Sequence, residues 1–391
     1  MKVSALFWYR LRHLLIFLIW WNISIRLFIY LRFAGQLDAG ESVAKAISII
    51  RDNQSIITIC ACVISIFTWL MEEFAFNKLL KRLGTVNGSI FRSLSYLVLF
   101  TVFSLFAGLW YNVVYHDVSF WKSLGSAERY LFNDTWLFFF IIVILTNWAM
   151  NLFVAAENHL GKGNINKILS GAYRVPQEEA KIFMFLDLVS SSRAAELLGH
   201  QRYSRFLQES FKEMSNLIIK HRATVYQYVG DEVVLVWDAK KPINYIRSLR
   251  FYFDLLNVWK EREQYYNDKY GITPLFTASL NSGKVMVAEV GEIKTEIAYH
   301  GDVLNTASRV QKVCKVYQQP LVVTQEFVTA AGKVNPEFEF SLLDDIELPG
   351  KENKVKIFGV TSNLGVEKHC CYESYYRKCN SYHKRIIGNT Q

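Results

Sequence analysis

Four long apolar stretches in the first 155 residues restrict the fold more than any other feature of the sequence. Each stretch approaches the roughly 20 residues that an α-helix needs to cross the hydrocarbon core of a bilayer. They cover approximately His13–Phe33, Ser55–Phe76, Ile90–Tyr115 and Leu131–Val154. Buried helices of a soluble protein are the alternative, but a soluble helix of this length normally keeps one polar face. We therefore expect a membrane domain of about four helices in residues 1–156.

The first stretch differs from the others because it contains Arg26 and lies near the N-terminus. A secretory signal peptide is the rival interpretation of such a segment. The apolar run is long, however, and no small-residue cleavage motif clearly follows it. We therefore expect a membrane span here as well.

Lys and Arg residues between the stretches predict how the chain is oriented, because cytoplasmic loops of membrane proteins are enriched in them. The residues that lack acidic counterparts precede the first stretch or lie around the start of the third: Lys2, Arg10, Arg12, Lys78, Lys81, Arg82 and Arg92. The other two connecting segments balance basic against acidic residues. We expect a multi-pass protein of the inner or plasma membrane, with the N-terminus and everything after Glu157 in the cytoplasm.

The chain carries a formal net charge of +9 at pH 7. Much of this excess lies beside the apolar stretches and in the tail at 363–391, so attraction to anionic lipid headgroups explains it more simply than nucleic acid does. We expect membrane lipid as a partner and no nucleic acid. The basic tail also contains five side chains that can ligate metals, in a spacing that matches no zinc pattern. They are His369, Cys370, Cys371, Cys379 and His383.

The composition changes after the last apolar stretch. Residues 157–180 are polar and contain glycine, which is typical of a connector. From Lys181 onward, a strand-like run (KIFMFLDL), a helical segment and a hairpin (TVYQYV, GDE, VVLVWD) are followed by a second helix and two strand-like pieces that surround a turn at NSG. This β-α-β-β-α-β order predicts an α+β ferredoxin-like domain over residues 181–362.

Two acidic residues occupy positions that the ferredoxin-like topology brings together. Asp187 ends the first strand, and Asp231 lies in the turn of the hairpin. Adjacent carboxylates repel each other unless a cation lies between them, and Mg²⁺ bound through carboxylates and substrate phosphates is the usual solution. The alternative for Asp231 is an ordinary turn residue, because Gly-Asp favours hairpin turns.

The residues after Asp187 open a helix with three serines, Ser190, Ser191 and Ser192. Free backbone N–H groups at a helix N-terminus suit a phosphate chain. The alternative is a serine that caps the helix and binds nothing else.

Four blocks in this order, FMFLDLVSSSRAAELLG, YQYVGDEVVLVW, LNSGKVMVAEVG and YHGDVLNTASRVQ, resemble the class III adenylyl/guanylyl cyclase catalytic domain. The resemblance covers about residues 180–362. The membrane part has no comparable signature, although its general layout is similar to that of membrane-anchored cyclases of bacterial type.

The resemblance implies a role for each matching residue. Asp187 and Asp231, with the carbonyl of Leu188, would hold two Mg²⁺ or Mn²⁺ ions in each active site. Asn305 would position the ribose, and Arg309 would counter the charge that develops on the α-phosphoryl group in the transition state. Lys284 and Lys351 match basic phosphate-binding positions of the family. For each lysine, the alternative is a solvated surface side chain.

In this family the metal-binding carboxylates and the Asn/Arg pair face each other across a dimer interface. Both sets are present in this one chain. The resemblance therefore implies a homodimer with two equivalent active sites, each built from both protomers.

Base recognition is where the sequence departs from the family pattern. Adenylyl cyclases usually carry Lys and Asp at the positions of Gln227 and Ala298, whereas guanylyl cyclases carry Glu and a small residue or Cys. Gln227 can both donate and accept hydrogen bonds, so it can pair with either purine edge. We expect conversion of ATP to cyclic AMP and pyrophosphate, because the guanine-associated Glu is absent.

Other functions stay open on the sequence alone. The first is a guanylyl or dual-specificity cyclase that uses GTP. The second is a receptor whose cyclase domain is catalytically weak, which the complete set of expected catalytic positions argues against. The third is a transporter with a regulatory domain, although the apolar stretches contain few of the charges that mark a substrate path.

Overall fold

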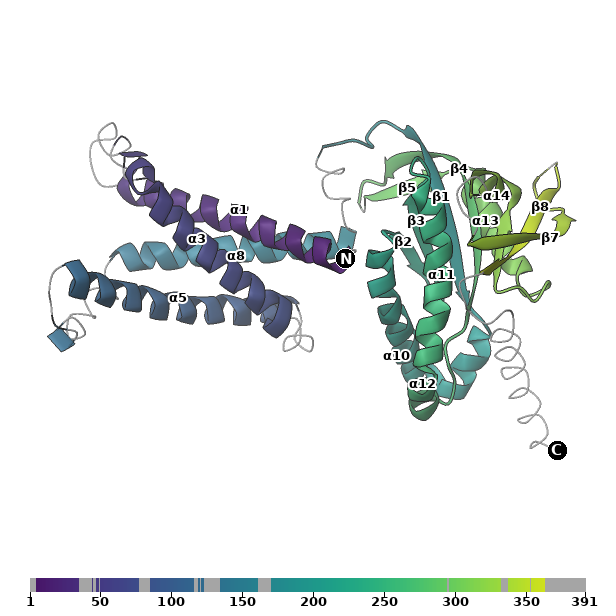
Figure 1. Ribbon diagram of the computed structural model, residues 1–391, viewed down its shortest axis with the longest axis horizontal. Coiled ribbons are helices and arrows are strands. Elements are labelled where there is room, and N and C mark those ends of the chain that lie inside the picture. Colours follow the sequence, from purple (N-terminus) through teal and green to yellow (C-terminus); the bar gives the residue numbers. More distant parts are fainter. Residues whose placement is uncertain are drawn as a thin grey trace. The chain divides into compact units, whose positions relative to one another are not determined.

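The computed structural model describes most of the chain, which divides into two compact units, one comprising Phe7–Leu160 and the other containing Gly161–Gln391 (Figure 1). The described residues are 5–34, 44, 47–48, 50–76, 85–115, 119, 121–122, 134–160, 170–293, 295–331, 337–351 and 353–362. The expected tail at 363–391, with its histidines and cysteines, lies outside them, as does 161–169 of the expected connector.

The first unit is helical, and long helices occupy the four apolar stretches. They are α1 (Ala5–Ala34), α3 (Gln54–Leu70), α5 (Thr85–Tyr115) and α8 (Asp134–Leu160). A short π-helix, η1 (Met71–Phe76), continues α3. Among the described residues, the windows Arg10–Tyr30 and Ile57–Phe74 are long and apolar enough to cross a membrane, and Phe140–Phe153 is a shorter apolar window. Two such windows are fewer than the four spans that the sequence predicts.

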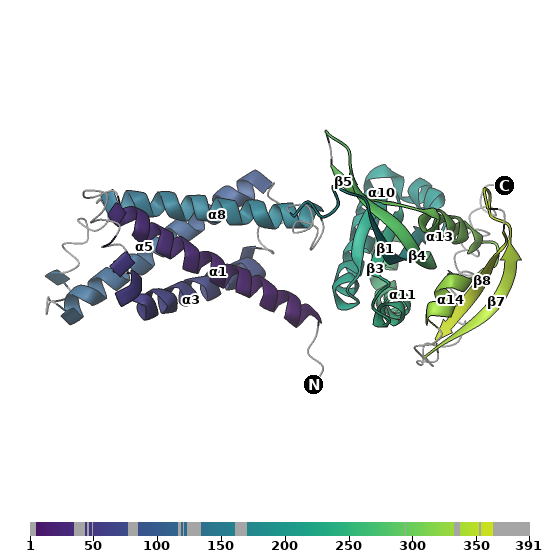
Figure 2. The ribbon, with the colours of Figure 1, turned by 90° about the horizontal axis from the view of Figure 1, so that it is seen from above.

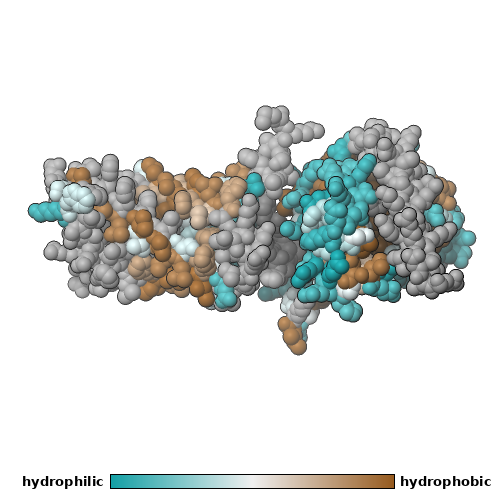
Figure 3. Space-filling model, turned by 90° about the horizontal axis from the view of Figure 1, so that it is seen from below, coloured by the Kyte–Doolittle hydropathy of each residue, from teal (hydrophilic) through white to brown (hydrophobic). Residues whose placement is uncertain are grey.

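The helical unit exposes large apolar side chains in addition to burying them. Among its described residues, the buried polar side chains are Ser24, Ser65, Thr68 and Asn147. Figure 3 shows hydrophobic surface gathered over this unit. Large apolar side chains lie exposed on every long helix, among them Ile19, Ile23, Ile59, Val63, Val98, Val102, Leu145 and Trp148. An apolar exterior with polar contacts between helices is the arrangement that a lipid solvent favours.

Several polar side chains between these helices are hydrogen-bonded to each other. The Arg26 guanidinium donates to Asn22 Oδ1 at 2.7 Å and to Thr58 Oγ1 at 3.0 Å. Trp21 Nε1 donates to Thr68 Oγ1 at 3.0 Å. The arginine that makes the first stretch irregular in sequence is therefore hydrogen-bonded between α1 and α3.

Ionisable side chains around η1 join all four long helices. Glu73 on η1 pairs with Arg10 of α1 at 2.9 Å, and its neighbour Glu72 pairs with Arg92 of α5 at 3.4 Å. Arg92 also donates to Asn151 Oδ1 of α8 at 3.1 Å. These contacts give each charge a partner, which is the condition for keeping charged groups within an apolar bundle.

In the described part of the second unit, eight strands form one sheet in the order β2-β3-β1-β4-β6-β8-β7, and β5 pairs with β4 (Figure 2). The strands are β1 (Gln177–Leu188), β2 (Thr224–Val229), β3 (Glu232–Asp238), β4 (Phe276–Val290), β5 (Glu296–His300), β6 (Leu321–Thr324), β7 (Phe338–Ile346) and β8 (Val355–Ser362). The helices are α10 (Ser191–Lys220), α11 (Ile243–Glu261), α12 (Glu263–Tyr270), α13 (Asp302–Val313) and α14 (Gln325–Ala331).

The elements from β1 to β4 have the order predicted for a ferredoxin-like fold. They run β1-α10-β2-β3-α11-α12-β4, and the pairs β1/β3, β1/β4 and β2/β3 are all antiparallel. The sheet then extends beyond β4, which pairs in parallel with β6. The domain is therefore an extended ferredoxin-like α+β fold, and β1 begins four residues earlier than Lys181, the boundary that the sequence predicted.

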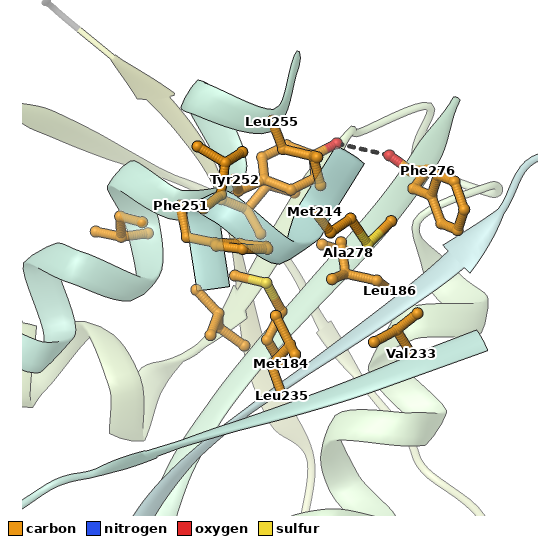
Figure 4. Packing of buried hydrophobic residues seen from close by; sticks show 14 of the residues in the cluster. Met184, Leu186, Met214, Val233, Leu235, Phe251, Tyr252, Leu255, Phe276 and Ala278 are labelled. Carbon is orange, nitrogen blue, oxygen red and sulfur yellow. Dashed lines mark hydrogen bonds between the residues drawn. The ribbon is translucent and has the colours of Figure 1, made fainter. Parts of the chain in front are cut away.

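The core explains why the β1 segment is apolar without alternation. Met184 and Leu186 of β1 pack on one face of the sheet against the helices, where Met214, Phe251 and Tyr252 lie (Figure 4). The intervening residues Phe183 and Phe185 are buried on the other face, in a cluster with Ala307 of α13. Successive side chains of a strand point to opposite faces, so a strand covered on both sides must be apolar throughout.

The predicted turn at NSG is wrong, because β4 runs through it as one strand. Ser282 and Gly283 continue the pairing with Ile182 and Lys181 of β1. A Cβ atom on Gly283 would lie 2.8 Å from Val303 Cγ2, so the glycine is required by the close approach of the α13 segment. Asn281 Nδ2 donates to the Val303 carbonyl at 3.0 Å, which fixes the same approach.

Candidate active site

The strand register brings the two predicted carboxylates together. Asp187 lies opposite Glu232, the first residue of β3. Asp231 is the adjacent residue in the turn between β2 and β3, where Gly230 adopts a φ of +62° that a residue with a side chain rarely takes. The pairing of β1 with β3 thus places Asp187 beside the hairpin turn that carries Asp231.

This edge of the sheet concentrates negative charge. Burial raises the pKa of Asp187, and the charge of Asp231 raises it further, whereas Lys315 and Gln311 act in the opposite direction. Burial, together with Asp187 and Asp231, also raises the pKa of Glu232. Carboxylates that disfavour each other's ionisation favour a bound cation, which removes the repulsion.

The donor set at this edge fits a hard divalent cation with an incomplete protein shell. The described residues contain no group of three or more His, Cys, Asp or Glu side chains arranged to hold a metal ion. Two carboxylates and a backbone carbonyl from Leu188 leave positions for substrate oxygens, which is how Mg²⁺ is usually bound at phosphate-transfer sites. The residues present therefore fit a divalent cation of the kind that the sequence predicts.

The serine segment follows shortly after Asp187 in the chain. The Val189 amide donates to the Leu275 carbonyl at 2.8 Å, and α10 begins at Ser191. Ser190 is in the left-handed region with φ +56°, and its side chain makes no capping hydrogen bond. The capping alternative is therefore wrong for Ser190. The first turn of α10, with Ser191 and Ser192, starts four residues after Asp187.

Helix α13 points the predicted Asn/Arg pair away from the sheet of its own chain. Its buried residues Thr306, Ala307, Val310 and Gln311 face the sheet. Asn305 is exposed and Arg309 is half-buried. Residues four apart share a helix face, whereas residues two apart lie on nearly opposite sides. Arg309 and Gln311 therefore project in different directions.

The sheet-facing side of α13 reaches Asp187. Gln311 hydrogen-bonds Asp187 and also donates to Thr277 Oγ1 at 3.2 Å. Thr277 is the β4 residue paired with Asp187. Lys315, one turn beyond Gln311, places Nζ 3.6 Å from Asp187 Oδ2. One side of α13 thus serves the carboxylate edge, and the other side carries Asn305 and Arg309.

The structure brings Lys351 to the Asn/Arg side of α13. Lys351 Nζ lies 2.8 Å from Asp302 Oδ2 in the first turn of the helix. The adjacent Gly350 also approaches Arg309, because a Cβ atom there would lie 3.7 Å from both Nη atoms. Lys351, Asn305 and Arg309 therefore belong to one surface of the chain.

Lys284 lies apart from the other predicted site residues. It pairs with Ala180 in the register of β1 and β4, and its side chain is 75% exposed and contacts Glu178 Oε1 at 2.8 Å. Thr277, the partner of Asp187, is seven residues away along β4. Seven residues of strand span about 23 Å, so Lys284 cannot reach Asp187 in its own chain.

The two predicted base-recognition residues lie on segments that meet. Gln227 is exposed on β2, directly after a bulge at Tyr226, and Ala298 is half-buried on β5. The rings of Tyr226 and Tyr299 pack edge to face with centroids 5.0 Å apart. This tyrosine contact joins the strand that carries Gln227 to the strand that carries Ala298.

Sequence reasoning missed Glu232, Gln311 and Lys315. The signal for Gln311 was its spacing, since it lies four residues after Ala307 and i and i+4 positions share a helix face. Lys315 lies two residues beyond the end of α13, so this rule does not place it. Using the rule requires knowing which face of α13 meets the sheet. That face is given by Thr306, Ala307 and Val310, which recur at helical spacing and are buried.

Residues 174–362 match the family model described as the adenylate and guanylate cyclase catalytic domain. This match covers both the edge of the sheet with Asp187 and Asp231 and the start of α10. The chain contains a catalytic domain of the class III nucleotide cyclase family, as its four motifs predicted.

The chain is also similar to individual proteins that are named adenylate cyclases. Adenylate cyclase 2 of Rhizobium meliloti (strain 1021) is 27% identical over 225 residues, which are 57% of this chain and 61% of the relative. The terminal-differentiation specific adenylate cyclase of Dictyostelium discoideum is 30% identical over 123 residues, 26% of this chain and 6% of the relative. The chain thus spans about three fifths of the Rhizobium relative. A solved bacterial light-regulated adenylyl cyclase aligns with 18% identity and a TM-score of 0.49, over 57% of this chain and 63% of that one.

Proposed function

We propose that this chain is a membrane-anchored adenylate cyclase that converts ATP to cyclic AMP and pyrophosphate in a homodimer. The main observation behind the proposal is that two sides of α13 face different surroundings. Gln311 contacts Asp187 within the chain, whereas Asn305 and Arg309 project away from it. A second copy of the chain would supply Asn305 and Arg309 to the Asp187 edge, so each dimer would contain two shared sites.

The reaction is an intramolecular phosphoryl transfer. The ribose 3′-oxygen forms a bond to the α-phosphorus, the bond from that phosphorus to the bridging oxygen of pyrophosphate breaks, and the 3′-hydroxyl loses its proton. Asn305 would orient the ribose, and Arg309 would stabilise the negative charge that develops on the α-phosphoryl oxygens. Lys351, on the same surface as Arg309, would bind the triphosphate.

Asp187, Asp231 and the Leu188 carbonyl would hold two Mg²⁺ or Mn²⁺ ions. When bound, these ions supply Lewis acidity at the 3′-oxygen and neutralise charge on the triphosphate. The backbone N–H groups at the start of α10, near Ser191 and Ser192, would bind phosphate oxygens. Lys284 lies beside Glu178 and not beside Asp187, so it cannot contact a substrate bound at Asp187 of its own chain. It would contact only a substrate that is bound elsewhere.

We infer ATP as the substrate from the chemistry of the base-reading position. Gln227 carries no negative charge to favour the N1–H and amino donors of guanine, and Ala298 offers only its backbone. The two relatives described above are named adenylate cyclases, which supports the same choice. The alternative is GTP turnover, and the experiment must distinguish it from ATP turnover.

The helical unit supports membrane anchoring through its apolar exterior and paired interior charges. We propose four spans formed by α1, α3, α5 and α8, with the catalytic unit in the cytoplasm. Lipid would be the solvent of this unit, and no nucleic-acid partner is proposed.

The test of the activity uses the purified full chain in detergent with either Mg²⁺ or Mn²⁺. ATP and GTP are supplied separately, and cyclic nucleotide and pyrophosphate are both quantified. We expect equal amounts of cyclic AMP and pyrophosphate from ATP, and a kcat/KM for GTP that is lower by tenfold or more. Release of pyrophosphate without cyclic AMP, or a preference for GTP, would contradict the proposal.

The test of the anchoring uses membranes from cells that express the chain. We expect the chain to stay in the membrane pellet after alkaline carbonate extraction. Protease added to inverted vesicles should degrade the catalytic unit, whereas right-side-out vesicles should protect it. Release by carbonate would reject the spans, and the reverse protease pattern would reject the orientation.

A further inference from the structure

The backbone at Lys315 is held in a fixed place beside the edge of the sheet that carries Asp187. Its neighbour Cys314 is fully buried, with Sγ 3.3 Å from the Ala278 carbonyl of β4. The backbone after α13 is ordered by hydrogen bonds from the Val316 amide to the Val313 carbonyl and from the Gln319 amide to the Cys314 carbonyl. These contacts aim the flexible side chain of Lys315 at Asp187 from a rigid base.

The ammonium of Lys315 contacts the same carboxylate that the metal requires. Nζ lies 3.6 Å from Asp187 Oδ2, and the two side chains are 49% and 21% exposed. Gln311 approaches Asp187 from the same side of α13 and is itself buried. The carboxylate therefore has one fixed neutral partner, Gln311, and one mobile cationic partner, Lys315.

An ammonium and a divalent cation cannot both lie against one carboxylate without strong repulsion, since like charges a few ångströms apart disfavour each other. The Lys315 side chain is half-exposed and has a long flexible stem, so it can leave Asp187 for solvent without breaking any buried contact. Gln311 can stay in place, because it carries no charge.

We propose that Lys315 is a positioning residue that neutralises Asp187 when no divalent ion is bound and competes with the metal for that carboxylate. The apparent metal affinity of the site is then set partly by this lysine. The inference rests on the proposed function, because it takes Asp187 as a metal ligand. The inference predicts the direction of the change in metal affinity. Removing the charge of Lys315 should tighten metal binding, whereas removing a lysine that only stabilised the fold should weaken it.

The test measures Mn²⁺ binding to the full chain in detergent by titration calorimetry, without nucleotide. Lys315→Gln is compared with the wild type, with Lys315→Arg, which keeps the charge, and with Lys354→Gln. Lys354 pairs with Glu347 at 3.3 Å in an exposed position, so its substitution removes the same charge elsewhere. Asp187→Asn identifies the part of the binding signal that belongs to this site.

We expect Lys315→Gln to lower the Mn²⁺ dissociation constant about threefold to fivefold, the scale of a partly exposed ion pair. Lys315→Arg and Lys354→Gln should bind no more tightly than the wild type. In activity assays of Lys315→Gln, the half-saturating Mn²⁺ concentration should fall by a similar factor, while kcat at saturating metal changes less.

Unchanged or weaker Mn²⁺ binding by Lys315→Gln would overturn the inference, as would equal tightening by Lys354→Gln. These outcomes leave the cyclase proposal intact as long as Asp187→Asn abolishes the signal. If Asp187→Asn binds Mn²⁺ as the wild type does, the metal assignment of the proposed function falls, and this inference falls with it. Thermal unfolding of each variant checks that binding differences do not arise from misfolding.

Discussion

The ammonium of Lys351 lies 2.8 Å from the carboxylate of Asp302, and this ion pair ties the loop between β7 and β8 to the first turn of α13. The same loop passes beside Arg309 at Gly350. A basic side chain from one segment and the helix that carries Asn305 and Arg309 are therefore presented together. Side chains held in this way before substrate arrives lose less conformational freedom when they bind it.

Replacing Lys351 should weaken binding of the triphosphate more than it slows the chemical step. We expect Lys351→Ala to lower kcat/KM for ATP about tenfold, mainly through KM, because a charge-assisted contact to phosphate is lost. Lys354→Ala is the matched control, since Lys354 forms an exposed ion pair with Glu347 and its replacement should leave kcat/KM nearly unchanged. Steady-state kinetics measure both, and an equal loss in the two variants would indicate a general charge effect.

Replacing either metal-binding carboxylate should abolish cyclisation while leaving the catalytic unit folded. Asp187→Ala and Asp231→Ala remove ligands from neighbouring strand ends, at the edge where burial and Asp231 raise the pKa of Asp187. Residual activity should be below about a tenth of the wild type, an effect larger than ~1.4 kcal/mol in the activation barrier. Asp345→Ala, an exposed substitution on β7, should keep normal activity. If Asp187→Ala or Asp231→Ala retained more than about a tenth of the wild-type activity, the metal-ligand role of that residue would be rejected.

Two inactive variants should restore activity when mixed. Asp187→Ala lacks one side of the shared site and Arg309→Ala lacks the other, so a heterodimer has one dead site and one intact site. Purified heterodimers should show about half of the wild-type rate, because each has one working site of two. Activity is measured after co-expression and tandem-tag purification of heterodimers. Purified heterodimers without activity would mean that each site lies within one chain.

How much of this site the sequence could predict depends on how local each relationship is. The apolar run that ends in Asp187 and the Gly-Asp turn at Asp231 are contiguous signals, and the ferredoxin-like order brings them together. Asn305 and Arg309 were recognisable by motif, but the direction they face depends on which residues of α13 pack on the sheet. That packing is a tertiary contact, which no local pattern contains.

The NSG segment shows why local signals can also mislead. Asn, Ser and Gly favour turns, and the sequence therefore predicted two short strands. Gly283 instead permits the close approach of Val303, and Asn281 bonds to the Val303 carbonyl. A glycine chosen for close packing and a glycine chosen for a turn look the same in a single sequence. The contact of Lys315 with Asp187 was invisible for a similar reason, since the two are 128 positions apart.

The stability of the catalytic unit should depend on pH through Asp254. Burial by itself raises the pKa of Asp254, but contacts with His221 at 2.8 Å and Lys220 at 2.7 Å outweigh it and lower the pKa from 3.8 to about 2. A carboxyl with a depressed folded-state pKa stabilises the fold above its unfolded pKa. That contribution is lost as the pH falls from about 4 to about 2.

We therefore expect Asp254→Asn to reduce the free energy of unfolding at pH 7 by ~1 kcal/mol, after allowance for solvent screening. Denaturant unfolding can be followed by fluorescence of Trp237, whose Nε1 donates to the His221 carbonyl. The difference in unfolding free energy between wild type and Asp254→Asn should become smaller as the pH falls from 4 to 2. Glu347→Gln, in an exposed pair with Lys354, should cost much less. If the difference in unfolding free energy did not change with pH, the loss of stability would come from packing and not from charge.

The choice of purine should depend on Gln227, which is exposed on edge strand β2 beside the bulge at Tyr226. Lys at this position can only donate and suits the acceptor N1 of adenine, so Gln227→Lys should favour ATP. Glu can accept from the N1–H and amino group of guanine, so Gln227→Glu should shift the preference toward GTP. A site that reads hydrogen bonds discriminates strongly, and the ratio of kcat/KM for ATP and GTP should move by about tenfold or more in opposite directions.

The control for this prediction is Lys354→Gln, which alters an exposed residue away from β2 and should leave the ratio unchanged. Both nucleotides are assayed with the same preparation and the same metal, so differences in active fraction cancel in the ratio. If both Gln227 variants stay within about twofold of the wild-type ratio, Gln227 faces solvent in the dimer and backbone groups read the base. The assignment of the catalytic domain to the cyclase family does not depend on that outcome, because it rests on residues 174–362 as a whole.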